Sequence, residues 1–365
     1  MAIMYARPTS ISRGSSRSAV SAAAYRSASR MELSFSDMSA AVRDKLSASY
    51  NEKYHLVNEN TGEVIGLVFD YRDKSGAIIS GIMAPDGAPE WVFDRQQLWQ
   101  SIENAGTRVD SRLAREFTIA LPVELTKEQN KELVKDFVKS SLVARGMVAD
   151  YNIHLDNPEN PHVHIMAVTR DLETNIDGKI SWGKVNLAWK NLSVLKAIRA
   201  EVANIINHHL EMYGHESRVS HLSHAARGLN IIPGVHEGPA RWIKNAELKK
   251  QNHEIALENA ARIIADPTIV IDQLSIDKPV FSSNDIEKGL HKALIMGINP
   301  SLINEKESFE LWCKSELLSM YNVVIASDKL TLVNPCDLKG RMLFARTDRL
   351  QKSPQGLSFP GSRSK

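Results

Sequence analysis

Three histidines near the middle of the chain have the residue type and spacing that metal chemistry needs. His162 and His164 lie two positions apart in an apolar stretch that reads as a strand, so their side chains share one face. His154 ends the preceding strand-like stretch, and the turn-rich loop 157–161 would place it opposite that pair. Three imidazoles that leave coordination positions open form a catalytic metal geometry. The alternative is a surface hairpin that happens to carry histidines.

Tyr25 is the second residue whose setting suggests chemistry. Alanines dominate residues 18–30 and predict a helix, in which Tyr25 is the one bulky side chain. The alternative is an aromatic anchored in the core, but small neighbours would leave this ring accessible. A phenol, with an ordinary pKa near ~10, is a weak nucleophile unless cations or a metal-bound phosphate favour the phenolate. A tyrosine that attacks a phosphodiester stores the broken bond as an ester, which suits an enzyme that later rejoins the strand.

The first thirty residues form a cationic segment without a single acid. The remaining residues carry 40 basic and 43 acidic side chains, so the body of the chain is slightly acidic. Such a segment attracts phosphate and predicts contacts with DNA. The alternative is a mitochondrial transit peptide, whose cleavage would remove Tyr25. The arginines concerned are Arg7, Arg13, Arg17, Arg26 and Arg30.

The composition limits the class of protein. With 365 residues, 43% hydrophobic and 24% charged, the chain is typical of a soluble globular protein of two or three domains. It has no run of 18 apolar residues, so no membrane insertion is expected. Two cysteines, Cys313 and Cys336, are too few for a disulfide framework or a thiolate zinc site, which indicates an intracellular, cytoplasmic protein. Imidazole ligands suit Zn²⁺ or Mn²⁺ better than bare Mg²⁺, but the sequence does not choose among the three ions.

Periodicity predicts the elements that must position these residues. The helix with the best signals begins at the capping box of Thr126 and Gln129 and ends at Gly146. The other predicted elements are strands over 2–12, 117–121, 148–155 and 162–169 and helices over 94–105 and 187–212.

The C-terminal third predicts a separate arrangement. A connecting helix over 241–265 ends at Asp266-Pro267. Residues 266–345 then predict a small domain with helices near 284–295 and 307–320 and a hairpin over 322–333. Helices followed by such a wing are typical of winged-helix-like DNA-binding domains. Residues 346–365 form a basic tail with a net charge of +4, which we expect to be disordered.

At these residues the sequence resembles the MobA/MobL family of conjugative relaxases over about residues 1–240. The similar blocks are Met1–Tyr5, Ser18–Ser29, Ala114–Leu125, Arg145–Asp150 and Asn160–Met166, of which the last is the most specific. The resemblance implies an α+β fold of the HUH relaxase type. In that fold an antiparallel sheet has helices packed on it, and the tyrosine helix and the histidine hairpin meet over the sheet.

The resemblance also implies roles for individual residues. Tyr25 would be the nucleophile that becomes linked to the 5′ phosphate, and the three histidines would hold a divalent cation on the scissile phosphate. Glu116 is the candidate base for the tyrosine, with Glu103 as its rival. Asp150 could orient a ligand histidine from outside the metal shell, or simply be a core aspartate at a strand start. The arginines of the first thirty residues would hold the DNA backbone.

The implied function is metal-dependent, site- and strand-specific nicking and rejoining of single-stranded or melted DNA at a plasmid transfer origin. The alternatives are a rolling-circle replication initiator with the same chemistry and a DNA-binding regulator that has lost activity. Beyond residue 240 the chain resembles the segment that precedes the helicase in Ti-plasmid TraA-like proteins. It contains no G-x-x-x-x-G-K-[ST] loop and hence no expected ATP site, so either it is a truncated relative or the motor is a separate chain. The expected partners are a helicase and accessory relaxosome or coupling proteins.

Overall fold

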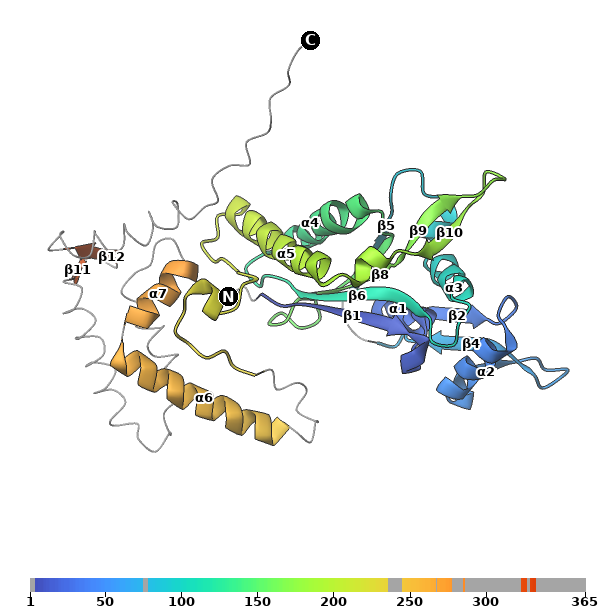
Figure 1. Cartoon of the computed structure of the whole chain (residues 1–365), viewed down its shortest axis with the longest axis horizontal. Coiled ribbons are helices and arrows are strands. Elements are labelled where there is room, and N and C mark those ends of the chain that lie inside the picture. The colour runs from blue at the N-terminus through green and yellow to red at the C-terminus, as the bar shows by residue number, and fades with distance from the viewer. Residues whose placement is uncertain are drawn as a thin grey trace, which may run out of the picture. The chain divides into compact units, whose positions relative to one another are not determined.

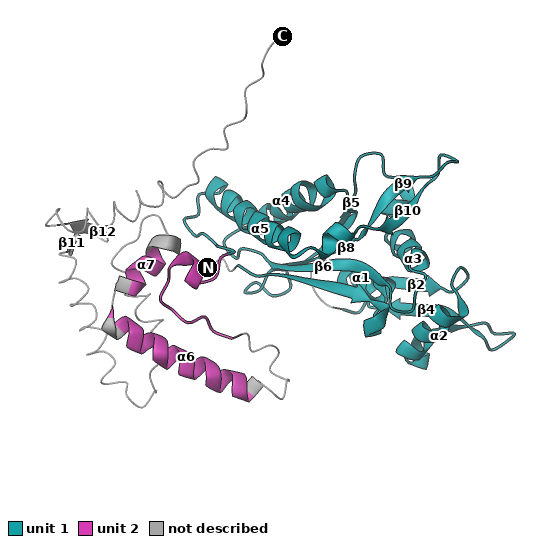
Figure 2. Cartoon of the chain, viewed as in Figure 1, with its two compact units in different colours: residues 1–221 teal, residues 222–365 magenta. Residues whose placement is uncertain are grey.

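The computed structural model describes residues 4–74, 78–235, 245–266, 268–277, 285, 323–326 and 329–332. It divides the chain into two compact units, Met1–His221 and Leu222–Lys365 (Figure 2). The boundary between the units falls after residue 221, whereas the sequence predicted that the first domain ends at residue 240. The larger unit contains all the residues that the sequence nominated for chemistry.

A five-stranded antiparallel sheet forms the centre of the larger unit (Figure 1). Its strand order is β1-β6-β8-β7-β5, so β1 and β5 are the edges. The sheet confirms the α+β class and the predicted strands, and it pairs segments that are distant in sequence. The strands are β1 (Ala6–Ser12), β5 (Ile78–Met83), β6 (Arg112–Ala120), β7 (Ala149–His154) and β8 (His162–Val168).

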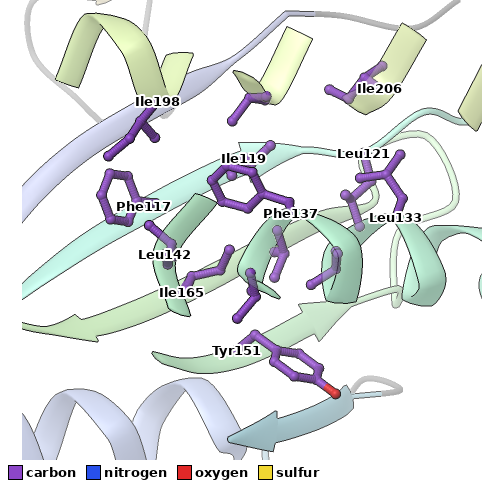
Figure 3. Packing of buried hydrophobic residues seen from close by; sticks show 14 of the residues in the cluster. Phe117, Ile119, Leu121, Leu133, Phe137, Leu142, Tyr151, Ile165, Ile198 and Ile206 are labelled. Atoms are coloured by element: carbon purple, nitrogen blue, oxygen red, sulfur yellow. The ribbon is translucent and has the colours of Figure 1, made fainter. Parts of the chain in front are cut away.

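Helices α4 (Lys127–Phe137) and α5 (Leu192–Met212) cover one face of this sheet (Figure 3). Alternate side chains of β6, such as Phe117 and Ile119, meet Phe137 of α4 and Ile206 of α5 in a buried apolar cluster. Burial of each such side chain contributes about 1.5–3 kcal/mol. This layer fixes the sheet, and the opposite face carries both a second apolar cluster and the polar residues of the histidine site.

The predicted boundaries of these two helices need small corrections. The capping box of Thr126 and Gln129 starts α4 as predicted, but a wider π turn (Val138–Leu142) and a 3₁₀ turn (Val143–Arg145) precede Gly146. The π turn keeps Val138 and Leu142 fully buried. The helix predicted over 187–212 begins as a 3₁₀ turn (Leu187–Lys190), because Asn191 accepts a hydrogen bond from Ser193 N and starts α5 anew.

A second layer covers part of the other face. Helices α1 (Ala19–Ser27) and α3 (Arg95–Ala105) pack together, because the alanines of α1 allow a close approach. A three-stranded sheet of order β2-β4-β3 and a further helix complete this layer. Their bounds are β2 (Arg30–Ser34), α2 (Ala40–Ser49), β3 (His55–Val57) and β4 (Val64–Asp70). A hairpin of β9 (Arg170–Thr174) and β10 (Ile180–Val185) follows β8.

The second unit contains the helix α6 (Asn245–Ala265), within the helix predicted over 241–265. Helix α7 (Thr268–Asp277) begins after the predicted break at Asp266-Pro267, and β11 (Val323–Ala326) pairs with β12 (Lys329–Leu332) in the predicted hairpin. Apart from residue 285, the helices predicted near 284–295 and 307–320 lie outside the described residues, as does the tail 346–365. The winged-helix-like domain therefore stays a prediction. In the part of the chain that the structure describes, every helix is too short or too polar to cross a membrane.

Candidate active site

The three histidines converge at the turn end of the β7–β8 hairpin. His154 pairs directly with His162, and His164 lies two pairs further along, opposite Asn152. The ring centroids are 5.1 Å apart for His154 and His162, 5.1 Å for His154 and His164, and 5.2 Å for His162 and His164. Each ring offers one nitrogen to a common centre, and these nitrogens lie within 4.8 Å of one another. The convergence predicted from the hairpin is therefore confirmed.

Each histidine places one ring nitrogen in a hydrogen bond that fixes the ring. His154 Nε2 donates to the Arg26 carbonyl (2.8 Å), and His162 Nδ1 donates to the Asn160 carbonyl (2.8 Å). His164 Nδ1 donates to Glu116 Oε1 (3.2 Å). Metal-binding histidines are held in this way, so that the remaining nitrogen keeps its lone pair for the ion.

The protonation of the cluster also fits a divalent cation. Burial lowers the pKa of His154 to about 4, and burial likewise lowers the pKa of His164. Both imidazoles are therefore neutral near pH 7, which is the form that binds a metal ion. Three imidazole nitrogens with orienting partners would hold Zn²⁺, Mn²⁺ or Mg²⁺, in decreasing order of fit to imidazole.

Glu116 links the histidines to α1. Its carboxylate accepts hydrogen bonds from His164, from Arg26 Nε and from Thr9 Oγ1 (3.1 Å), and Arg17 Nη2 lies 3.7 Å away. Burial alone would raise the pKa of Glu116, but the hydrogen bond from His164 and the charge of Arg26 lower it to about 2. So stable a carboxylate is a weak base. Its contacts suit the orientation of His164 better than proton abstraction from a tyrosine.

Tyr25 occupies the last turn of α1 and is 49% exposed, so it is not a core aromatic. Its ring packs against that of Tyr71 in an edge-to-face arrangement, with the ring centroids 5.3 Å apart. Lys74 Nζ lies 4.1 Å from the centroid of the Tyr25 ring. The next residue, Arg26, bonds to His154 through its carbonyl and to Glu116 through its side chain. The candidate nucleophile is therefore next in sequence to a residue that contacts both His154 and the carboxylate bonded to His164.

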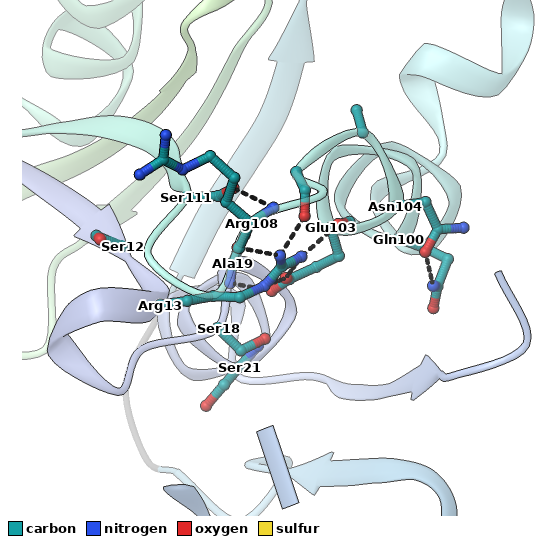
Figure 4. Close-up of polar contacts among 12 residues, drawn as sticks. Ser12, Arg13, Ser18, Ala19, Ser21, Gln100, Glu103, Asn104, Arg108 and Ser111 are labelled. Atoms are coloured by element: carbon teal, nitrogen blue, oxygen red, sulfur yellow. Dashed lines mark hydrogen bonds and ion pairs between the residues drawn. The ribbon is translucent and has the colours of Figure 1, made fainter. Parts of the chain in front are cut away.

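The opposite end of α1 is sealed by a buried ion pair (Figure 4). Glu103 is fully buried; it accepts from Arg13 Nη2 (2.8 Å) and from Ala19 N (2.6 Å), the first residue of the helix. Arg13 is 1% exposed and also donates to the carbonyls of Gly106 and Arg108.

These positions correct two expectations. Arg13 is not a candidate for DNA contact, because its guanidinium is buried and hydrogen-bonded to Glu103 and to backbone carbonyls. Glu103 lies at the first residue of α1, whereas Tyr25 is six positions later, about 9 Å along the helix axis. Distance and burial therefore withdraw Glu103 from the candidate bases.

Asp150 holds the framework of the site and touches none of the three histidines in the described contacts. It is fully buried and accepts from Arg95 Nε (2.8 Å), Trp99 Nε1 (2.9 Å) and Asn152 Nδ2 (3.1 Å). These bonds tie α3 to β7, as a core aspartate would. Asp150 therefore matches the alternative of a core aspartate that the sequence left open, and the carboxylate that contacts a histidine is Glu116.

The other arginines differ in how freely they face solvent. Arg7 is exposed on the edge strand β1, opposite Thr118 and hence on the histidine face of the sheet. The Arg17 side chain is 41% exposed beside Glu116. Arg26 is buried at 7%, and Arg30 is paired with Glu32 at 2.6 Å. Arg7 and Arg17 are therefore the arginines best placed to meet a phosphate.

Sequence reasoning missed Lys74 and Tyr71, which contact Tyr25. Both follow β4 in a region whose order the sequence pattern did not reveal. No local signal marks them, because they reach Tyr25 only through the packing of β4 beside α1.

Comparison with known proteins places the chain in a family. Residues 39–247 match the model of the MobA/MobL family. The chain is 30% identical over 332 residues to the conjugal transfer protein TraA of Rhizobium radiobacter, an alignment that covers 80% of this chain but only 27% of that protein. It is 28% identical to the mobilization protein MobL of Acidithiobacillus ferridurans, over 77% of this chain and 75% of the relative. A solved structure described as the molecular basis of vancomycin resistance transfer in Staphylococcus aureus is 28% identical, with a TM-score of 0.48, and covers 61% of this chain and all of that one. The chain belongs to the MobA/MobL family.

Proposed function

We propose that this protein nicks and rejoins one DNA strand at a plasmid transfer origin, with Tyr25 as nucleophile and a divalent metal ion at His154, His162 and His164. The observation that carries the proposal is the double contact of Arg26 with His154 and Glu116, because it brings the Tyr25 turn to the histidine cluster. The family match begins at residue 39 and contains the histidines but not Tyr25. The role of Tyr25 therefore rests on this geometry and on the resemblance of residues 18–29.

The proposed reaction exchanges one phosphoester for another. The Tyr25 hydroxyl loses its proton and attacks phosphorus, the bond from phosphorus to the 3′ oxygen breaks, and that oxygen takes up a proton. The strand is then held as a 5′-phosphotyrosyl ester, which the freed 3′ hydroxyl can attack to restore the original bond. A metal ion on the three histidines would polarise the scissile phosphate.

The chain's own residues would divide the remaining tasks. Glu116 keeps the His164 ring oriented, and Arg26 holds the end of α1 against the cluster. Arg7 and Arg17 would bind backbone phosphates of single-stranded or locally melted DNA, where positive charge favours the polyanion. A helicase or accessory relaxosome protein would supply unwinding in the bacterial cytoplasm.

A covalent-adduct assay tests this function. The protein is mixed with a labelled single-stranded oligonucleotide of its own transfer origin and Mn²⁺, then run on a denaturing gel. We expect a shifted band that EDTA removes and that Tyr25→Phe and His162→Ala abolish. The control is Tyr213→Phe, which should retain the adduct, because the Tyr213 hydroxyl donates to Glu132 on α4. Binding without an adduct would instead support the inactive regulator, and an adduct formed by Tyr25→Phe would reject this nucleophile.

A further inference from the structure

Lys74 lies against the ring of Tyr25 and is used by nothing in the proposed reaction so far. Its Nζ is 4.1 Å from the ring centroid and donates a hydrogen bond to the Tyr25 carbonyl at 3.3 Å. Lys74 follows β4 in a turn that starts at Tyr71, whose ring packs edge-on against the same tyrosine. Two side chains from one loop therefore bracket the ring.

The position of Tyr25 on its helix explains why a cation is needed there. Tyr25 lies in the last turn of α1, where the free carbonyls carry partial negative charge. That end of a helix disfavours a phenolate or a phosphate ester. Arg26 is in the same turn, but Glu116 already compensates its charge.

Lys74 supplies charge at this point. Burial lowers the pKa of its ammonium group, while Asp156 acts in the opposite direction and Arg26 adds to the lowering. Apart from Asp156, no acid of the described residues contributes to its electrostatics. Its contact with Tyr25 thus combines a cation over a π face with a hydrogen bond to the helix end.

We propose that Lys74 is a positioning residue for the nucleophile, which holds the Tyr25 ring and stabilises the negative charge that develops on its phenol oxygen. This inference rests on the proposed function. Lys74 transfers no proton in the reaction, and the bonds made and broken are those of the ester exchange given above. Among the described residues, the structure offers one similar contact as a control, Lys53 Nζ over the Tyr54 ring at 4.8 Å.

The test measures single-turnover rates of adduct formation at saturating oligonucleotide for Lys74→Met, Lys74→Arg and Lys53→Met. We expect Lys74→Met to react about tenfold more slowly at pH 7. The deficit should shrink towards pH 10, where a phenol ionises unaided and the ammonium group of Lys74 begins to lose its own proton. Lys74→Arg should recover most of the rate, and Lys53→Met should stay within about twofold of the wild type. Melting temperatures of all variants report whether the fold is intact.

A binding measurement separates positioning from phosphate contact. In a Tyr25→Phe background, which cannot react, Lys74→Met should leave oligonucleotide affinity unchanged within about threefold. A large loss of affinity with a normal saturated rate would overturn the proposal and make Lys74 a DNA contact. A pH-independent deficit, or a full rate in Lys74→Met, would also overturn it. Absence of an adduct with the wild-type protein would reject the proposed function itself, and this inference with it.

Discussion

The two ends of α1 carry the same kind of ion pair and use it differently. At the first residue, Glu103 and Arg13 are 0% and 1% exposed and bond to each other and to the surrounding backbone. At the last turn, Glu116 and Arg26 are also largely buried, but the carboxylate extends the network to His164 and the Arg26 carbonyl extends it to His154. The first pair closes a helix end, and the second connects a helix end to the histidine cluster. Ion pairing alone therefore does not mark a site, because the further partners decide its use.

The largest expected effect concerns the sealed end. Arg13→Met should lower the free energy of unfolding by about 3–5 kcal/mol, because it leaves the Glu103 charge buried without a partner. The double variant with Glu103→Met should regain much of that loss, since two apolar side chains need no pairing. Urea unfolding followed by circular dichroism measures both. A loss under about 1 kcal/mol in the single variant would mean that water reaches this end of α1 and that the comparison fails.

The second prediction concerns the last turn of α1, where Glu116 and Arg26 contact the histidine cluster. Glu116→Gln should weaken Mn²⁺ binding by about 10- to 100-fold, because the amide orients His164 less firmly than a carboxylate does. Isothermal titration calorimetry gives the affinity directly. Glu103→Gln is the matched control: it should lose stability and, where still folded, bind Mn²⁺ as the wild type does. Equal affinities in the two variants would remove the distinction between the ends.

The smallest expected effect concerns Arg17, which lies near Glu116. Its distance of 3.7 Å from Glu116 and its 41% exposed side chain predict a stability change within about 0.5 kcal/mol in Arg17→Ala. If it meets a phosphate, the salt dependence of oligonucleotide binding should decrease by about one unit of slope. Arg145→Ala is the control, because Arg145 pairs with Glu201 of α5, which covers the opposite face of the sheet. An unchanged slope in Arg17→Ala would exclude Arg17 from the DNA path.

Local signals predicted the elements with strong patterns and failed where pairing is distant. The alanine-rich helix, the capping box of Thr126 and the histidine hairpin are present within a few residues of their predicted bounds. The segment 31–80 gave no order, because β2 and β3 both pair with β4 and each is too short to show a pattern alone. The sequence did not single out Lys74 either, because its contacts with Tyr25 join segments that are distant in the sequence.

The sequence by itself determined which residues could do chemistry. The turn-rich loop 155–161 joins β7 directly to β8, so the pairing of His154 with His162 follows from local sequence, and α1 follows from its alanines. Tertiary structure alone decided which acid serves the site. Glu103 and Glu116 each bond to an arginine 90 positions earlier, and nothing in their local sequence separates them. Only the packing of α1 across the sheet and against α3 encloses one of these carboxylates and brings the other to His164.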